Sequence, residues 1–215
     1  MFVDYQASLE LESRNGFGTL TADNYGDYLV QAYLQPSATV YLQELSNSER
    51  DSYLAEHRWI TWAEGAATFS WEDYVSSLGR TKGLPAFDDL DMFKPEPQLF
   101  SDATTDTRHF TDFSLRLSTG DPTAAVDGEL KHIVDLMNAM YFLGQDDPAT
   151  VGHWWIRHGA ADKDTALPVI VNLATSLENL GKDVNTLLYW DAGHATDEDP
   201  ENFISWVGEI TGYGQ

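Results

Sequence analysis

Two loops near the C-terminal end of the chain hold side chains that could move a proton. One loop reads His158-Gly-Ala-Ala-Asp162-Lys-Asp164-Thr165, and the other reads Asp191-Ala-Gly-His194. A carboxylate that accepts a hydrogen bond from one imidazole nitrogen fixes the tautomer of the ring and stabilises its protonated form. The other nitrogen can then act as a general base. Asp162 and His194 are therefore candidates for an acid–base pair.

The residues before these loops predict the strands that must position them. The mostly apolar runs HWWIRHG at 153–159 and VNTLLYW at 184–190 are typical of buried strands. A helix is expected between them, opening at Asp164-Thr165 and ending before Gly181. Its expected inward residues are Ile170, Leu173, Leu177 and Leu180. Because ligands bind beyond the carboxyl ends of parallel strands, both loops are expected at one edge of the sheet.

Helices are also expected before the first strand and after the second. Asp121-Pro122 is typical of a helix start, and the apolar stripe that follows runs to about Gly144. Asp199-Pro200 predicts the last helix in the same way. The stripe of the earlier helix consists of Leu130, Ile133, Val134, Met137 and Met140.

The pattern helix–strand–helix–strand–helix predicts an α/β fold over residues 121–215, with two parallel strands and flanking helices. Continuous apolar strands imply burial on both faces, so neighbouring strands are expected that this chain does not contain. The order acid and then histidine is the one in which an α/β-hydrolase completes its catalytic triad. We therefore expect the C-terminal portion of such a fold, with an incomplete sheet.

Residues 1–120 have a different pattern, which predicts a mostly helical insertion and a connection. Ser46 with Glu49 forms a capping box before a helix through Leu54, and Ser70 with Asp73 could start another helix from Trp71 to Leu78. No part of residues 1–83 alternates like a sheet. Residues 83–120 are rich in Pro and Asp and are interpreted as a connection.

The composition excludes several classes of protein. The chain has 35 Asp and Glu against 12 Lys and Arg, for a net charge of −23, and no Lys/Arg run. Binding to nucleic acid or to an anionic membrane surface is therefore not expected. The absence of Cys excludes disulfides and thiolate metal sites. No apolar stretch is long enough for a membrane span, and the first residues lack the features of a signal peptide, which leaves the compartment unassigned.

The segment GHWWIRHGAADKDTALPVIVNLATSLENLGKDVNTLLYWDAGHATD resembles the C-terminal triad segment of bacterial tannases. The resemblance extends upstream through MNAM (137–140), LPAFDDLDM (84–92), WITW and WEDYVSSLGRTKG, and covers most of the chain from about Ser48. Tannases are α/β-hydrolases that split galloyl and related phenolic esters. The resemblance implies a serine esterase of the tannase or feruloyl-esterase type that needs no cofactor and whose helical insertion is a lid.

The resemblance also implies roles for five residues. Asp162 is expected as the triad acid and His194 as the triad base. Asp164, Lys82 and Glu96 correspond to the residues that hold the ring hydroxyls of a small phenolic ester. A carboxylate that accepts phenolic protons, with a lysine that donates in return, is suitable chemistry for such a ring.

The nucleophile of the family is not found in this chain. A serine esterase exposes its serine on a strained G-x-S-x-G turn, and no serine here has glycine at the second position on both sides. Because the family order is nucleophile, lid, acid and histidine, the chain is expected to begin inside the lid. Its expected partner is an N-terminal hydrolase half that carries the serine, and alone it is expected to be inactive.

Other interpretations remain open at this stage. Asp162 or Asp164 could merely cap the following helix, with His194 as a surface residue. A metal cluster could be drawn from His153, His158, Asp162, Asp164 and His194, but the two strand histidines lie at opposite ends of one strand, so no metal is expected. The chain could also be an inactive accessory fragment of an α/β-hydrolase. A small unrelated α/β binding domain is a further alternative.

Overall fold

A computed structural model describes residues 2–14, 16–79, 85–145 and 149–213. The chain divides into two compact units. Met1–Gly79 and Ala149–Gln215 form the first unit, and Arg80–Pro148 form the second. In the first unit, the N-terminal helices share one hydrophobic core with the C-terminal strands.

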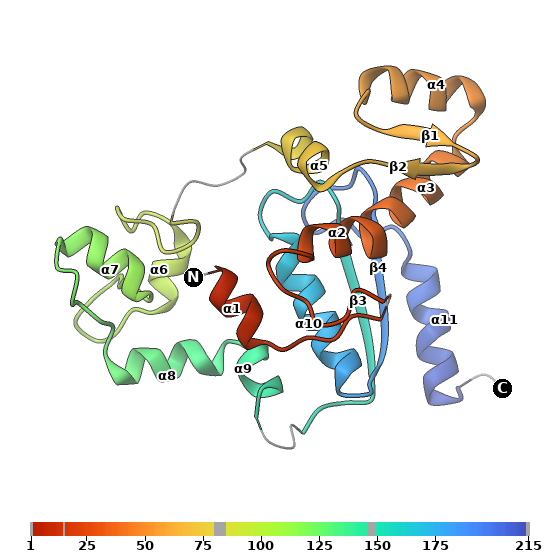
Figure 1. Ribbon diagram of the computed structural model, residues 1–215. Helices are drawn as coiled ribbons and strands as arrows, with labels where there is room; N and C mark the ends of the chain where they lie inside the picture. Colours follow the sequence, from red (N-terminus) through yellow and green to blue (C-terminus); the bar gives the residue numbers. More distant parts are fainter. Residues whose placement is uncertain (1, 15, 80–84, 146–148, 214–215) are drawn as a thin grey trace. The chain divides into compact units, whose positions relative to one another are not determined.

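The centre of the first unit is a two-stranded parallel sheet of β3 (His153–Gly159) and β4 (Asp183–Tyr189). The two predicted strands are confirmed, and they pair from His153 with Asp183 to Gly159 with Tyr189. Helix α10 (Leu167–Asn179) connects them, and α11 (Pro200–Thr211) follows β4. Figure 1 shows α10 and α11 on opposite sides of the two strands. This in-register pairing brings the loops after β3 and β4 to the same edge.

Helix α10 begins later than the sequence suggested. Its N-cap is Ala166, and Pro168 occupies the first turn, where its missing N–H costs nothing. The amides of Asp164 and Thr165 are instead bonded to the side chain of Asp162, so this segment forms a turn. The predicted inward stripe is also partly wrong, since Leu180 follows the helix and is exposed. The buried apolar residues of α10 are Leu167, Val171, Ala174 and Leu177.

The N-terminal helices pack on this sheet and complete the core. Leu29, Leu34 and Leu42 are fully buried in one cluster with residues of α10 and β4. A hydrogen bond of 2.7 Å from Ser37 Oγ to the carbonyl oxygen of Leu188 ties the layer to β4. The elements are α1 (Phe2–Ser8), α2 (Tyr25–Leu29), the π-helix η1 (Val30–Leu34), α3 (Gln35–Glu44), α4 (Asn47–Glu56) and α5 (Trp71–Leu78).

Both predicted capping boxes are confirmed. The side chain of Ser46 accepts from the amide of Glu49 at the start of α4, and Ser70 accepts from the amide of Asp73 at the start of α5. The expectation that this region contains no sheet is wrong, because β1 (Thr61–Ala63) and β2 (Ala66–Thr68) form an antiparallel hairpin. Glu64 and Gly65 close it with φ of 53° and 79°, as a two-residue hairpin turn requires.

The predicted last helix is confirmed as α11, although Asp199 does not cap it through its side chain. The carboxylate of Asp199 instead accepts hydrogen bonds of 3.1–3.2 Å from the guanidinium of Arg157 on β3. Arg157 in turn lies over the ring of Trp155, and Trp155 packs against Trp206 of α11. This face of β3 therefore holds α11 through one ion pair and an aromatic cluster.

The second unit contains α6 (Pro95–Leu99), α7 (Asp112–Thr119), α8 (Gly128–Leu136) and α9 (Ala139–Leu143). The single helix expected from Asp121 to about Gly144 is wrong. Asp121 accepts bonds from Thr123 in a turn, and Asp127 caps α8 instead. Asn138 then interrupts the helix, because its side chain accepts from the amide of Met140 and starts α9.

Residues expected to form a plain connection contain a buried polar centre. The Asp88 carboxylate contacts His109 Nδ1 at 2.8 Å and accepts from the amide of Thr111 at 2.8 Å and from its hydroxyl at 2.6 Å. Asp88 and His109 are both buried. These bonds join Asp88 to residues 109–111 and so hold this part of the second unit together. Among all the helices of the described residues, none has the length and apolar character needed to cross a membrane.

Candidate active site

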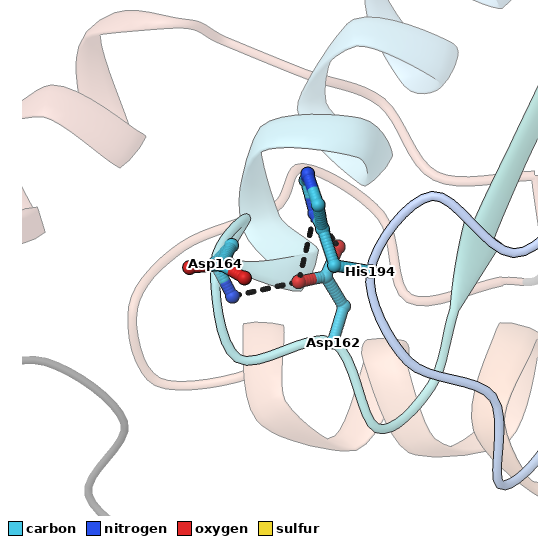
Figure 2. Close-up of side chains that lie close together, drawn as sticks. All are labelled: Asp162, Asp164 and His194. Atoms are coloured by element: carbon cyan, nitrogen blue, oxygen red, sulfur yellow. Dashed lines mark hydrogen bonds and ion pairs between the residues drawn. The ribbon is translucent and has the colours of Figure 1, made fainter. Parts of the chain in front are cut away.

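The loops after β3 and β4 bring a carboxylate and an imidazole into contact. His194 Nδ1 lies 3.1 Å from Asp162 Oδ2 and 3.3 Å from Asp162 Oδ1. Figure 2 shows this contact, with Asp164 on the same loop as Asp162. The side chain of Asp162 is almost completely buried, at 3% exposed, whereas that of His194 is 54% exposed. The pair thus has one fixed, desolvated member and one member that other molecules can reach.

Gly159 allows the two loops to approach each other. A Cβ atom on Gly159 would lie 2.3 Å from the carbonyl oxygen of Gly193 and 2.4 Å from that of Ala192. Two backbone bonds of 2.8 Å hold the contact, from Ala160 N to Tyr189 O and from Ala161 N to Ala192 O. Because carbonyl oxygens cannot move out of the way as a flexible side chain can, this position requires glycine.

Backbone amides hold Asp162 in place independently of His194. Its Oδ1 accepts from the amide of Asp164 at 2.7 Å and from that of Thr165 at 3.0 Å. Burial acts to raise the pKa of the Asp162 carboxyl, but the hydrogen bonds from Thr165, Asp164 and His194 outweigh it, and the pKa is lowered. Asp162 is therefore a carboxylate at neutral pH and can stabilise a protonated imidazole.

A second imidazole lies behind the pair. His158 Nδ1 is 3.6 Å from Asp162 Oδ2, and the side chain of His158 is 6% exposed. Burial lowers the pKa of His158, and this effect exceeds the opposing influence of the Asp162 charge. His158 is thus neutral at pH 7, so that the carboxylate keeps its charge for His194.

Of the five predicted site residues, Asp162, Asp164 and His194 lie together. Glu96 lies in α6 of the second unit, and Lys82 lies outside the described residues. The alternative that Asp162 or Asp164 caps the next helix is wrong, because the N-cap of α10 is Ala166 and has no side-chain cap bond. Sequence reasoning missed Gly159; the signal for it was a glycine at the end of a strand, which often marks a close backbone approach.

The five residues from which a metal cluster could be drawn do not all lie together in the described part of the chain. His153 lies at the opposite end of β3, 2.9 Å from Asp183. Three of these residues, Asp162, Asp164 and His194, each offer one ligand atom. These three atoms lie within 4.8 Å of one another, an arrangement that would suit a metal ion. The same three groups are the ones that acid–base chemistry and recognition of a hydroxylated ring would use.

Comparison with known proteins defines the class of this fold. No protein-family model and no curated protein matches the chain. Solved structures do match, and they show a fold of the α/β-hydrolase type with mixed helices and a small sheet. The native tannin acyl hydrolase of Lactobacillus plantarum is 31% identical with a TM-score of 0.80, and the alignment covers 97% of this chain and 44% of that one.

These matches fit a partial tannase and confirm the resemblance seen in the sequence. The tannase of Fusobacterium nucleatum is 30% identical with a TM-score of 0.78, over 97% of this chain and 44% of that one. A tannin acyl hydrolase in complex with ethyl gallate gives the same values of 30%, 0.78, 97% and 44%. The chain therefore spans less than half the length of the tannases that it matches.

We predict that Gly159→Ala separates the two loops and destabilises the chain. The added Cβ must push away two carbonyl oxygens, and overpacking of this kind costs about 1–3 kcal/mol. Urea unfolding measures the change in the free energy of unfolding. Gly152→Ala, just before the other end of β3, is the matched control, because an added Cβ there meets nothing within 4 Å. Equal stability of the two variants would contradict the prediction.

We also predict a pH dependence of stability that arises from His158. Because its pKa in the folded chain is lowered, the unfolded chain binds the proton more readily, and stability falls as the pH drops below about 6.5. His158→Gln should remove this part of the loss between pH 6.5 and 5, as measured by urea unfolding at each pH. His153→Gln is the control at the exposed end of the same strand. If the free energy of unfolding of His158→Gln falls between pH 6.5 and 5 as much as that of the wild type, other groups cause the loss.

Proposed function

We propose that this chain forms part of a tannase-type carboxylic ester hydrolase that cleaves galloyl or related phenolic esters. The observation that carries the proposal is the contact of His194 Nδ1 with Asp162 at the ends of two adjacent parallel strands. The likeness to tannases, including one in complex with ethyl gallate, supports the same substrate class.

In the proposed mechanism, Asp162 orients His194 and His194 moves the proton. With Nδ1 bonded to Asp162, the imidazole presents Nε2 on the opposite side of the ring. Nε2 takes the proton of a serine hydroxyl as its oxygen attacks the ester carbonyl. Nε2 then gives this proton to the departing alcohol, leaving an acyl-serine. A water molecule then gives a proton to Nε2 as its oxygen attacks the acyl group. Nε2 returns this proton to the serine oxygen, and the acid is released.

The serine of this mechanism is proposed to lie on an N-terminal hydrolase half. No serine of the chain has the G-x-S-x-G setting, and the matched tannases are more than twice as long. We propose that residues 121–215 supply the C-terminal part of the hydrolase fold, and that residues 1–120 supply a lid region and connection. The two-stranded sheet of β3 and β4 would be extended by strands of the missing half. The chain alone would then show little hydrolysis.

Recognition of the acyl ring is proposed to involve Asp164, Lys82 and Glu96. Asp164 is exposed on the loop that carries Asp162, next to the proposed reaction centre. Glu96 Oε2 is buried without a hydrogen-bond partner among the described residues, so it has an acceptor available for a phenolic hydroxyl. An ammonium group at Lys82 would donate to the same hydroxyls.

We predict that methyl gallate is hydrolysed when the chain is mixed with a separately expressed N-terminal half, and not by the chain alone. Asp162→Asn should lower kcat of the mixture about 10³- to 10⁴-fold, because the tautomer of His194 is no longer fixed. His194→Ala should lower it by at least as much. If the chain and the N-terminal half associate but hydrolyse no methyl gallate, the alternative of an inactive accessory fragment is favoured. Robust turnover by the chain alone would require a different nucleophile.

We further predict that Asp164→Asn weakens recognition of ring hydroxyls. In the active mixture, KM for methyl gallate should rise about 10- to 150-fold, because a hydrogen bond to a charged acceptor contributes about 1.5–3 kcal/mol. KM for methyl benzoate, which has no ring hydroxyl, should stay unchanged. Glu201→Gln, in the exposed first turn of α11, controls for the loss of one negative charge. A parallel change for both esters would exclude the proposed contact.

A further inference from the structure

The loop that carries His194 begins and ends on one group of hydrogen-bonded side chains. Residues 190–198 lie between β4, which ends at Tyr189, and α11, whose N-cap is Asp199. The hydroxyl group of Tyr189 donates a hydrogen bond to the carboxylate of Asp199, and so joins the start of the loop to its end. The guanidinium group of Arg157 on β3 donates to the same carboxylate at 3.1–3.2 Å. We call Arg157, Tyr189 and Asp199 the loop clamp.

Arg157 connects this clamp to both strands of the sheet. Its Nε and Nη2 atoms donate to Asp199. Its Nη1 atom donates to Asn185 on β4, at 2.9 Å to the carbonyl oxygen and at 3.0 Å to the side-chain oxygen. Cζ of Arg157 also lies 3.4 Å from the centre of the Trp155 ring. Because the side chains of Arg157 and Asp199 are each only 11% exposed, water weakens their ion pair little, and its geometry is well defined.

The charges of the clamp favour these hydrogen bonds at neutral pH. Burial opposes the ionisation of Asp199, but the hydrogen bonds from Arg157 and Tyr189 outweigh this effect, and the pKa of Asp199 is lowered. Burial, and next to it the hydrogen bond to Asp199, raises the pKa of Tyr189 to about 12. Asp199 is therefore a carboxylate that accepts, and Tyr189 is a neutral phenol that donates.

The backbone of the loop has an uncommon conformation on both sides of His194. Asp191 has a φ of 61° and Ala195 a φ of 57°, in the left-handed region that residues with a Cβ atom rarely adopt. Such conformations persist only where the surrounding structure holds them. The bond from Ala161 N to Ala192 O holds the first part of the loop, and the clamp holds its end. His194 lies between these two attachments with its side chain 54% exposed, so the loop backbone must place the ring.

We propose that the loop clamp positions His194 for proton transfer, so that Arg157, Tyr189 and Asp199 are positioning residues of the reaction. The inference rests on the proposed function, in which His194 is the general base. The clamp acts through the loop backbone, which keeps Nδ1 of His194 against Asp162 and leaves Nε2 without a proton, ready to accept that of the serine. When the clamp is broken, the loop relaxes, Nδ1 loses its partner, and the neutral ring redistributes between its two tautomers.

The first test uses the chain alone and measures the tautomer of His194 from the chemical shifts of its ring nitrogens, at about pH 9, where an imidazole is neutral. The wild type should hold the proton on Nδ1, which faces Asp162. Asp199→Ala should give a mixture of both tautomers, and Tyr189→Phe a smaller change in the same direction. Asp199→Ala combined with Arg157→Met leaves no unpaired charge in the clamp, and serves if Asp199→Ala alone does not fold.

Two controls separate positioning of His194 from general support of the fold. Glu178→Gln removes a carboxylate from another arginine, Arg14, near the C-terminal end of α10. Trp206→Ala loosens the packing of α11 on Trp155. Both should lower the free energy of unfolding in urea and leave the tautomer of His194 unchanged. The inference is overturned if the clamp variants leave the tautomer unchanged, or if Trp206→Ala alters it as much as they do.

The second test measures hydrolysis of methyl gallate by the chain mixed with its N-terminal half. Asp199→Ala should lower kcat about 10- to 100-fold, because a displacement of about 1 Å at the reacting groups costs about 100-fold. KM should stay close to that of the wild type, since the proposed contacts to the ring lie elsewhere. A rise in KM with kcat unchanged would overturn the inference and leave the proposed function standing. If the wild-type mixture hydrolyses no methyl gallate, the proposed function fails instead, and the tautomer of His194 still decides whether the clamp positions the ring.

Discussion

The close approach of the two strand-end loops is the constraint on which the rest of the site depends. Gly159 gives the backbone of residues 192–193 room to lie against the end of β3, and two backbone hydrogen bonds fix that contact. Only with this spacing does His194 reach the carboxylate of Asp162. The core beneath, which joins the N-terminal helices to α10 and β4, holds both strands in the required register.

The side chains of the site differ in burial, and this difference gives them different chemical roles. Desolvation of Asp162 and His158 would be costly if both were charged, but the hydrogen bonds to Asp162 favour its ionised form and burial keeps His158 neutral. One net negative charge therefore remains behind His194. The half-exposed imidazole faces outward from this charge, which is the arrangement that a proton carrier needs.

Much of this arrangement could be predicted from local patterns in the sequence. Both strands and the capping boxes at Ser46 and Ser70 follow from short-range signals whose physical cause is local. The pair Asp162–His194 joins residues 32 apart, and it could be predicted because each loop follows a strand and parallel strands end at the same edge of a sheet. The hairpin at Glu64-Gly65 was missed because its strands are short and do not alternate. The break at Asn138 was missed because an apolar stripe carries no sign of where a side chain will cap a helix. The Asp88–His109 centre depends on contacts between residues 21 apart, which periodicity cannot reveal.

The anchoring of Asp162 by the amides of Asp164 and Thr165 has a consequence for assembly. Because these amides belong to the same loop, the carboxylate is oriented by the folding of this chain. Conformational freedom at the acid is thus lost during folding rather than during the encounter with a second polypeptide or a substrate. In the proposed two-part enzyme, a complementary polypeptide would bring its serine hydroxyl to an imidazole whose carboxylate partner is already oriented, so its own contribution to ordering the acid would be small.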